Sequence, residues 1–188
     1  MIWLRSLTVL GALLLPIAAT GQQASIGDFF GEWQGMEVTT SGAEAPALPA
    51  EFLNTQIRAD GAGFRIRWNA LGRTEGKLEP REVDTSFVPT ERPGVFAFDA
   101  YQGTSFFGRL LADPATGNPL DGQTLLWARI EAATLIVYGL SINPRGGYDI
   151  HRHAWTLTGD GASNAQYIRR TEDPHILTIE GRLQRAGG

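Results

Sequence analysis

Phe29-Phe30-Gly31-Glu32-Trp33-Gln34-Gly35 opens the first predicted strand of this chain. Gly31 lets the backbone turn without a Cβ clash, and Trp33 has a ring large enough to cover one end of a core. Gly35 permits a kink or the close approach of another segment. The residues that follow alternate as in a half-buried strand, with one set on the apolar face: Met36, Val38 and Thr40.

Short runs in which apolar and polar side chains alternate, separated by turn residues, continue to the C-terminus and predict an all-β domain. Short turns such as Asp60-Gly61-Ala62-Gly63 make successive strands antiparallel. The chain has nine to eleven predicted strands, and an up-and-down barrel of about eight to ten of them is the predicted architecture, because closure removes every exposed edge. A two-sheet β-sandwich is the alternative. The predicted strands after the first are 52–58, 63–70, 82–88, 95–101, 105–111, 123–130, 134–142, 148–157, 165–170 and 176–185.

Gly31-Glu32-Trp33 resembles the G-x-W motif of the calycin-type barrels, the lipocalins and their lipocalin-like relatives. With Gly35 the pattern is also similar to the G-x-W-x-G opening of the nitrobindin-like, ten-stranded barrels. The resemblance implies that Trp33 plugs the closed end of a barrel and that an arginine from a late strand covers it. Three arginines are candidates for that position: Arg169, Arg170 and Arg182.

The likeness to nitrobindin also brings haem into consideration as a cofactor, because that family binds haem through a histidine on the last strand. The corresponding residues here, 177–183, contain no histidine, and His175 lies just before them in a turn-like Asp-Pro-His sequence. We therefore expect no cofactor.

Residues 1–21 have the pattern of a secretory signal peptide, and residues 22–188 are the predicted barrel domain. Arg5 supplies the positive charge, and an apolar run from Leu7 to Ala19 leads to small residues suited to cleavage. The run is shorter than the roughly 20 residues that span a bilayer. We expect no membrane span and a periplasmic or secreted protein.

Composition removes several classes of function. The chain has no cysteine, which excludes disulfides, a cysteine nucleophile and a lipid anchor on cysteine. Its formal net charge is −4 and it has no basic tract, so nucleic acid is not an expected partner. There is no G-x-S-x-G elbow and no phosphate-binding P-loop, and the sequence predicts no active site.

Asp149, His151 and His153 alternate along one predicted strand, so their side chains share a face. Imidazole and carboxylate groups are suitable ligands for zinc or copper. Trp155 and Leu157 continue that face, which indicates that part of it is buried. We favour a histidine pair at a barrel mouth or on the outer wall over a metal site.

Numerous aromatic residues suggest a cavity that holds a small apolar or amphipathic ligand. The predicted function is therefore an exported, lipocalin-like binding protein without catalysis. Two alternatives stay open: an enzyme at the barrel mouth, with His151 or His153 as general base beside Asp149, and a structural or envelope-interaction module with a filled barrel. The candidate cavity residues are Trp33, Trp68, Phe96, Phe98, Trp127, Tyr138 and Trp155.

Overall fold

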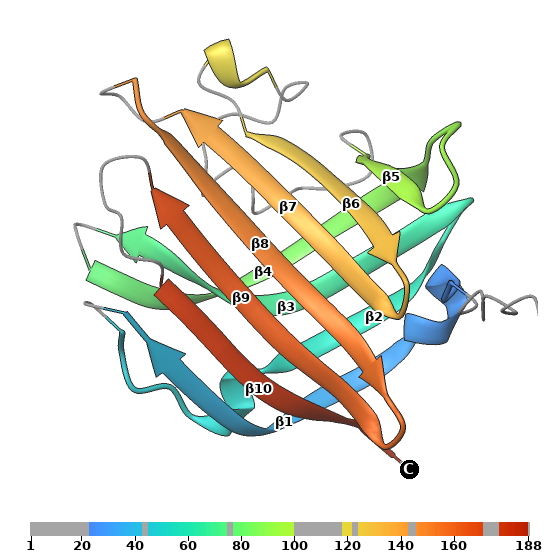
Figure 1. Cartoon of the computed structure of the whole chain (residues 1–188), viewed down its shortest axis with the longest axis horizontal. Helices are drawn as coiled ribbons and strands as arrows, with labels where there is room; N and C mark the ends of the chain where they lie inside the picture. The colour runs from blue at the N-terminus through green and yellow to red at the C-terminus, as the bar shows by residue number, and fades with distance from the viewer. Residues whose placement is uncertain are drawn as a thin grey trace, which may run out of the picture.

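Ten antiparallel strands close into one up-and-down barrel, which confirms the predicted fold class (Figure 1). The computed structural model describes residues 23–42, 45–74, 77–99, 118–121, 124–142, 146–170 and 177–187. Each strand pairs with its neighbours in sequence, and β1 closes the barrel by pairing with β10. The strands are β1 (Gly31–Ser41), β2 (Asn54–Asp60), β3 (Gly63–Thr74), β4 (Lys77–Pro89), β5 (Val95–Phe98), β6 (Leu125–Glu131), β7 (Thr134–Ile142), β8 (Tyr148–Thr158), β9 (Gly161–Arg170) and β10 (Leu177–Arg185).

Three short 3-10 helices accompany the strands: η1 (Ile26–Phe29), η2 (Ala50–Phe52) and η3 (Pro119–Asp121). No helix in the described ranges is long and apolar enough to cross a bilayer. The predicted signal peptide (1–21) and the predicted strand at 105–111 lie outside the described residues.

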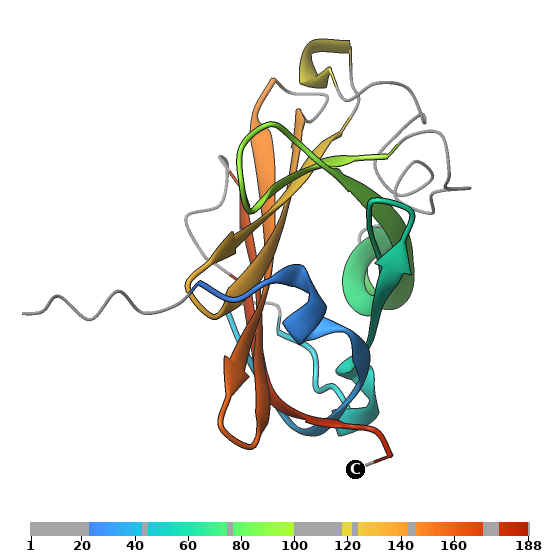
Figure 2. The ribbon, with the colours of Figure 1, turned by 90° about the vertical axis from the view of Figure 1, so that its right-hand side faces the viewer.

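Two walls face each other across the barrel. Figure 1 shows β6 to β10 crossing in front of β1 to β4, and Figure 2 shows the same walls from the side, with the interior between them. One continuous core fills much of that interior and draws side chains from all ten strands as well as from η1 and η2. Strands that place alternate side chains inward account for this arrangement.

A bulge in β1 corrects one feature of the predicted alternation. The pairing of β1 with β10 shifts register between Gly35 and Glu37, and Met36 lies 61% exposed instead of on the apolar face. An extra residue in one strand of an antiparallel pair bends that strand and leaves one side chain out of step. Gly35 permits the close approach predicted for it, because a Cβ there would clash with Ala50 O and with the Leu53 side chain.

Trp33 closes one end of the barrel and is 3% exposed. Its Nε1 donates a hydrogen bond to Phe29 O at 2.9 Å, which ties β1 to helix η1. The guanidinium of Arg185 lies 4.6 Å from the centre of the Trp33 ring, and its Nη2 donates to Asp28 O at 2.9 Å. Hydrogen bonds from the Ser25 backbone and hydroxyl lower the pKa of the Asp28 carboxyl.

The arginine over Trp33 is therefore Arg185, and none of the three predicted candidates. Strand register is the reason: Trp33 pairs directly with Arg185 across β1 and β10, so both side chains are on the same face. Arg182 pairs with Glu37 on the outer face, and Arg169 is exposed on β9. The side chain of Arg170 lies outside the described residues.

Candidate functional site

The end opposite Trp33, where β1, β3, β5, β7 and β9 end and β2, β4, β6, β8 and β10 begin, is here called the mouth. The inward face of β8 shows how far the barrel is open from this end. Asp149 and His151 are partly exposed, whereas His153 and Trp155, further along the same face, are 3% and 1% exposed. Exposure on this face therefore falls between His151 and His153.

Other inward-facing residues show the same change with depth. Phe98 and Leu177 are partly buried at the mouth, whereas Phe96 and Ile179, two positions along the same strands, belong to the buried core. On β7, Ser141 is partly exposed and pairs with Asp149. We define the mouth half of the interior as the inward-facing residues Phe98, Ser141, Asp149, His151 and Leu177.

His153 is a buried, neutral histidine. Trp68 Nε1 donates a hydrogen bond to His153 Nδ1 at 3.1 Å, so the proton of the neutral ring is on Nε2. The pKa of His153 is lowered to about 3, mainly by burial and also by the charge of nearby His151, while a hydrogen bond with Gln166 opposes both effects. A group with this pKa is too weak a base for proton abstraction near neutral pH.

Hydrogen bonds between the two walls form a floor beneath the mouth. Gln166 Nε2 on β9 donates to Asn69 O on β3 at 3.0 Å and to Asn164 Oδ1 at 3.4 Å. Trp155 Nε1 on β8 donates to Thr55 Oγ1 on β2 at 3.1 Å. Because these polar atoms satisfy one another, they hold the walls together at the centre of the barrel. We define the floor as Thr55, Trp68, His153, Trp155, Asn164 and Gln166.

Thr85 is an exception to this pairing. Its side chain is 1% exposed between Val83 and Phe87 on the inward face of β4, and its Oγ1 has no hydrogen-bond partner. A buried hydroxyl without a partner is destabilising.

The seven predicted cavity residues do not line one space. Trp33, Trp68, Phe96 and Trp155 belong to the packed core, and Phe98 lies at the mouth. Trp127 and Tyr138 face outward, which corrects the expectation that they point into the barrel. They pair across β6 and β7 with stacked rings 4.9 Å apart at 11°, and the guanidinium of Arg129 lies 5.5 Å from the Tyr138 ring. Successive side chains of a strand point to opposite faces, and Leu126 and Ala128 on either side of Trp127 are buried inside the barrel, so Trp127 points outward.

Within the ranges that the structure describes, no group of three or more His, Asp or Glu side chains is arranged to hold a metal ion. Asp149, His151 and His153 share the inward face of β8, but Nδ1 of His153 accepts the hydrogen bond from Trp68. His175 lies outside the described residues.

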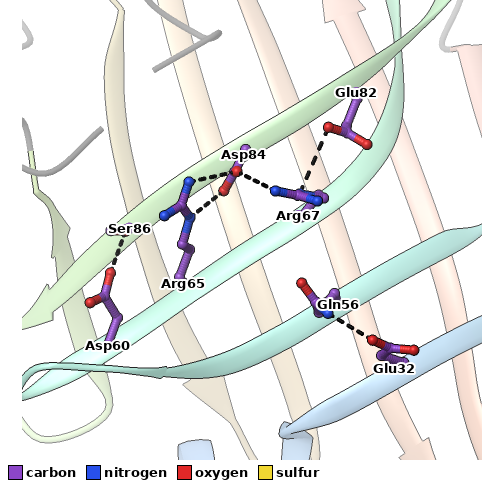
Figure 3. Close-up of polar contacts among 8 residues, drawn as sticks. All are labelled: Glu32, Gln56, Asp60, Arg65, Arg67, Glu82, Asp84 and Ser86. Carbon is purple, nitrogen blue, oxygen red and sulfur yellow. Dashed lines mark hydrogen bonds and ion pairs between the residues drawn. The ribbon is translucent and has the colours of Figure 1, made fainter. Parts of the chain in front are cut away.

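The outer face of β1 to β4 has a network of paired charges (Figure 3). Arg65 makes two hydrogen bonds to Asp84, at 2.6 and 2.7 Å, and Arg67 Nη2 donates to the same carboxylate at 3.0 Å. The hydrogen bond from Arg65 is the main cause of a lowered pKa at Asp84. Ser86 donates to Asp60, and Gln56 donates to Glu32. These groups satisfy one another and indicate a structural role.

Hollows lie on the outer wall within the described part of the chain. One of about 230 Å³ adjoins the charge network on β1 to β4. Two more, of about 560 and 680 Å³, lie side by side on β8, β9, β10 and β1 and share Glu37, Ser163 and Arg182.

Comparison with protein-family models, with curated proteins and with solved structures gave no significant match. The closed ten-stranded antiparallel architecture is compatible with a calycin-type barrel.

Proposed function

We propose that this protein binds a small amphipathic molecule in the mouth half of its barrel and that it does so without catalysis. The observation that carries the proposal is the change in exposure along the inward face of β8, from Asp149 and His151 to His153 and Trp155. Small molecules usually bind in concave sites, and partly exposed, inward-facing side chains above a buried floor suit such a site.

The chemistry of the mouth half supports an amphipathic ligand. Phe98 and Leu177 offer apolar surface, while Asp149, His151 and Ser141 offer hydrogen-bonding groups on the adjacent strands β7 and β8. A few polar groups placed among apolar side chains orient a ligand and make its binding specific. The floor supports a role in binding over one in proton transfer, because His153 is buried and neutral.

The relation to calycin-type barrels belongs to the same proposal. The ten strands are as many as in the nitrobindin-like barrels, and the contact of Arg185 with Trp33 supports the role of a plug that the motif implies. Export to the periplasm is a further part, supported by the sequence of residues 1–21. N-terminal sequencing of the protein purified from the periplasm tests it, with a mature start between Thr20 and Ser25 as the expected result.

Titration with Nile red and with 1-anilinonaphthalene-8-sulfonate tests the site. Both probes should fluoresce on binding and accept energy from the buried tryptophans Trp68 and Trp155. The variant His151→Trp fills the mouth and should weaken binding by at least roughly tenfold, equivalent to ~1.4 kcal/mol. Tyr148→Ala is the matched control: it is on the same strand but faces outward, and it should bind as the native protein does.

Failure of the folded native protein to bind either probe would contradict the proposal and favour a filled barrel with a structural role. Equal binding by native protein and His151→Trp would also contradict it, because the probes would then bind elsewhere.

A further inference from the structure

The outer face of β8, β9, β10 and β1 is hollowed where a barrel wall is usually convex. The hollow of about 560 Å³ is lined by outward-facing residues of these strands, and the adjoining one of about 680 Å³ extends it toward the turn between β8 and β9. Both volumes lie in the range of small-molecule sites, about 300–1,000 Å³. This face is separate from the mouth half.

Small side chains make the floor of this outer groove. Ala165 pairs with Ala154 on β8, and Ser163 pairs with Thr156 on the same strand. These small outward-facing side chains on β8 and β9 lie beside longer ones, among them Arg152 and Tyr167.

An aromatic side chain bounds the groove toward the mouth. Tyr167 on β9 pairs directly with Arg152 on β8, and the Arg152 guanidinium lies 5.1 Å from the centre of the Tyr167 ring. A cation–π contact of this kind restrains both side chains at an exposed site. The groove thus has a Tyr167 ring held in place at its edge.

Charged and hydroxyl groups form the rest of the lining. Glu37 on β1 pairs with Arg182 on β10, and Glu180 is two positions before Arg182 on the same face. In the hollow of about 560 Å³ the formal charges of Arg152 and Arg182 cancel those of Glu37 and Glu180, and Asp160 adds one negative charge in the adjoining hollow. Thr134 and Thr156 add hydroxyls that hydrogen-bond to each other at 2.9 Å. The lining is rich in donors and acceptors and has no excess of positive charge.

We propose that the outer groove binds a saccharide. A sugar ring has hydroxyls at its edge, which pair with carboxylate, guanidinium and hydroxyl groups, and C–H faces, which pack on an aromatic ring such as Tyr167. A lining with no excess of positive charge favours a neutral ligand over an anion, since Glu37 and Glu180 would repel a phosphate or carboxylate. The small side chains of Ala154, Ser163 and Ala165 leave room for a ring above the sheet.

Titration with three neutral tetrasaccharides of different linkage, cellotetraose, maltotetraose and chitotetraose, tests this assignment by calorimetry and by NMR chemical shifts. At least one should bind at concentrations up to roughly 10 mM, and Tyr167→Ala should weaken that binding by at least about tenfold. Ala165→Arg fills the floor and should abolish it. The matched control is Ala97→Arg, an exposed outward position on β5, which should bind like the native protein.

Absence of binding by all three sugars, or unchanged binding by Ala165→Arg, would overturn the proposal. A native dimer that Ala165→Arg dissociates would overturn it as well, since the groove would then be an interface between copies. Nile red binding at the mouth should be the same in Ala165→Arg and in the native protein, so failure here is distinguishable from failure of the mouth site.

Discussion

The two halves of the barrel interior contain the same kinds of side chain, but these side chains differ in how far they are buried. In the mouth half, Asp149 and His151 are partly exposed; two positions further along β8, His153 is buried and bonded to Trp68. The difference is one of depth, not of residue type. Buried polar groups that hydrogen-bond to one another are structural cross-links, whereas partly exposed polar groups stay accessible to water and ligand.

The largest difference in stability between the two halves should appear when one inward-facing side chain of each is replaced by alanine. Trp155→Ala removes a 1% exposed ring and its hydrogen bond to Thr55, so it should lower the free energy of unfolding by about 3–5 kcal/mol. His151→Ala, on the same face of the same strand, should lower it by less than about 1 kcal/mol. Urea denaturation of both variants measures the difference. Equal losses would show that the mouth half is packed as tightly as the floor.

The depressed pKa of His153 predicts a pH dependence of stability. Unfolded His153 titrates near 6.5 and folded His153 near 3, so between these values the unfolded chain binds more protons and acid favours unfolding. The stability of the native protein should exceed that of His153→Gln by an amount that shrinks below pH 6.5, by up to ~1.4 kcal/mol per pH unit. Above pH 6.5 the difference should be constant.

Denaturation of both proteins at pH 7, 5 and 4 measures this effect. The lowered pKa of Asp84 also reduces stability in acid, but it does so equally in both proteins and cancels in the difference. A gap between the two proteins that stays the same from pH 7 to pH 4 would mean that His153 is not buried.

Replacing each of two buried threonines should give the smallest difference in stability. Thr55→Val leaves Trp155 Nε1 without its acceptor and should cost about 1–3 kcal/mol. Thr85→Val removes a buried hydroxyl that has no partner, so it should be neutral or slightly stabilising. Thermal unfolding of the pair checks this. If Thr85→Val is the more destabilising of the two, the Thr85 hydroxyl has a partner in solution.

Most of the fold could be predicted from the sequence because alternation and turn residues are local signals. The hairpin turn at Asp60–Gly63 and the strand at 134–142 lie where they were predicted. Alternation with Ile179 and Leu183 favours Arg185 over Arg182 for the inward face, but which residue of β10 lies opposite Trp33 depends on register, which is not a local property. The exposed Met36 depends on a bulge, which sequence alternation alone does not reveal.

The candidate site was predicted in part. The shared face of Asp149, His151 and His153 follows from spacing alone, and the structure has this face inside the barrel. Their separation into mouth and floor could not be predicted, because it depends on Trp68 and Gln166 from other strands. Trp127 and Tyr138 were assigned inward from composition, although alternation with Leu126 and Ala128 was a signal for the outer face. The outer groove was not predicted, because it depends on the sizes of side chains that three different strands bring together.

Cysteine accessibility along β7 tests the central claim, an open mouth half above a closed floor, most directly. The native chain has no cysteine, so each introduced thiol is the only one present. Ser141→Cys and Val137→Cys are near-isosteric changes on the same inward face, and Val137, which pairs with His153, is 1% exposed. Maleimide should label Ser141→Cys at a rate near that of the exposed reference Ala97→Cys. It should label Val137→Cys at least roughly 100-fold more slowly, because labelling there requires opening of the barrel. Similar rates for Ser141→Cys and Val137→Cys, fast or slow, would contradict the division of the interior into two halves.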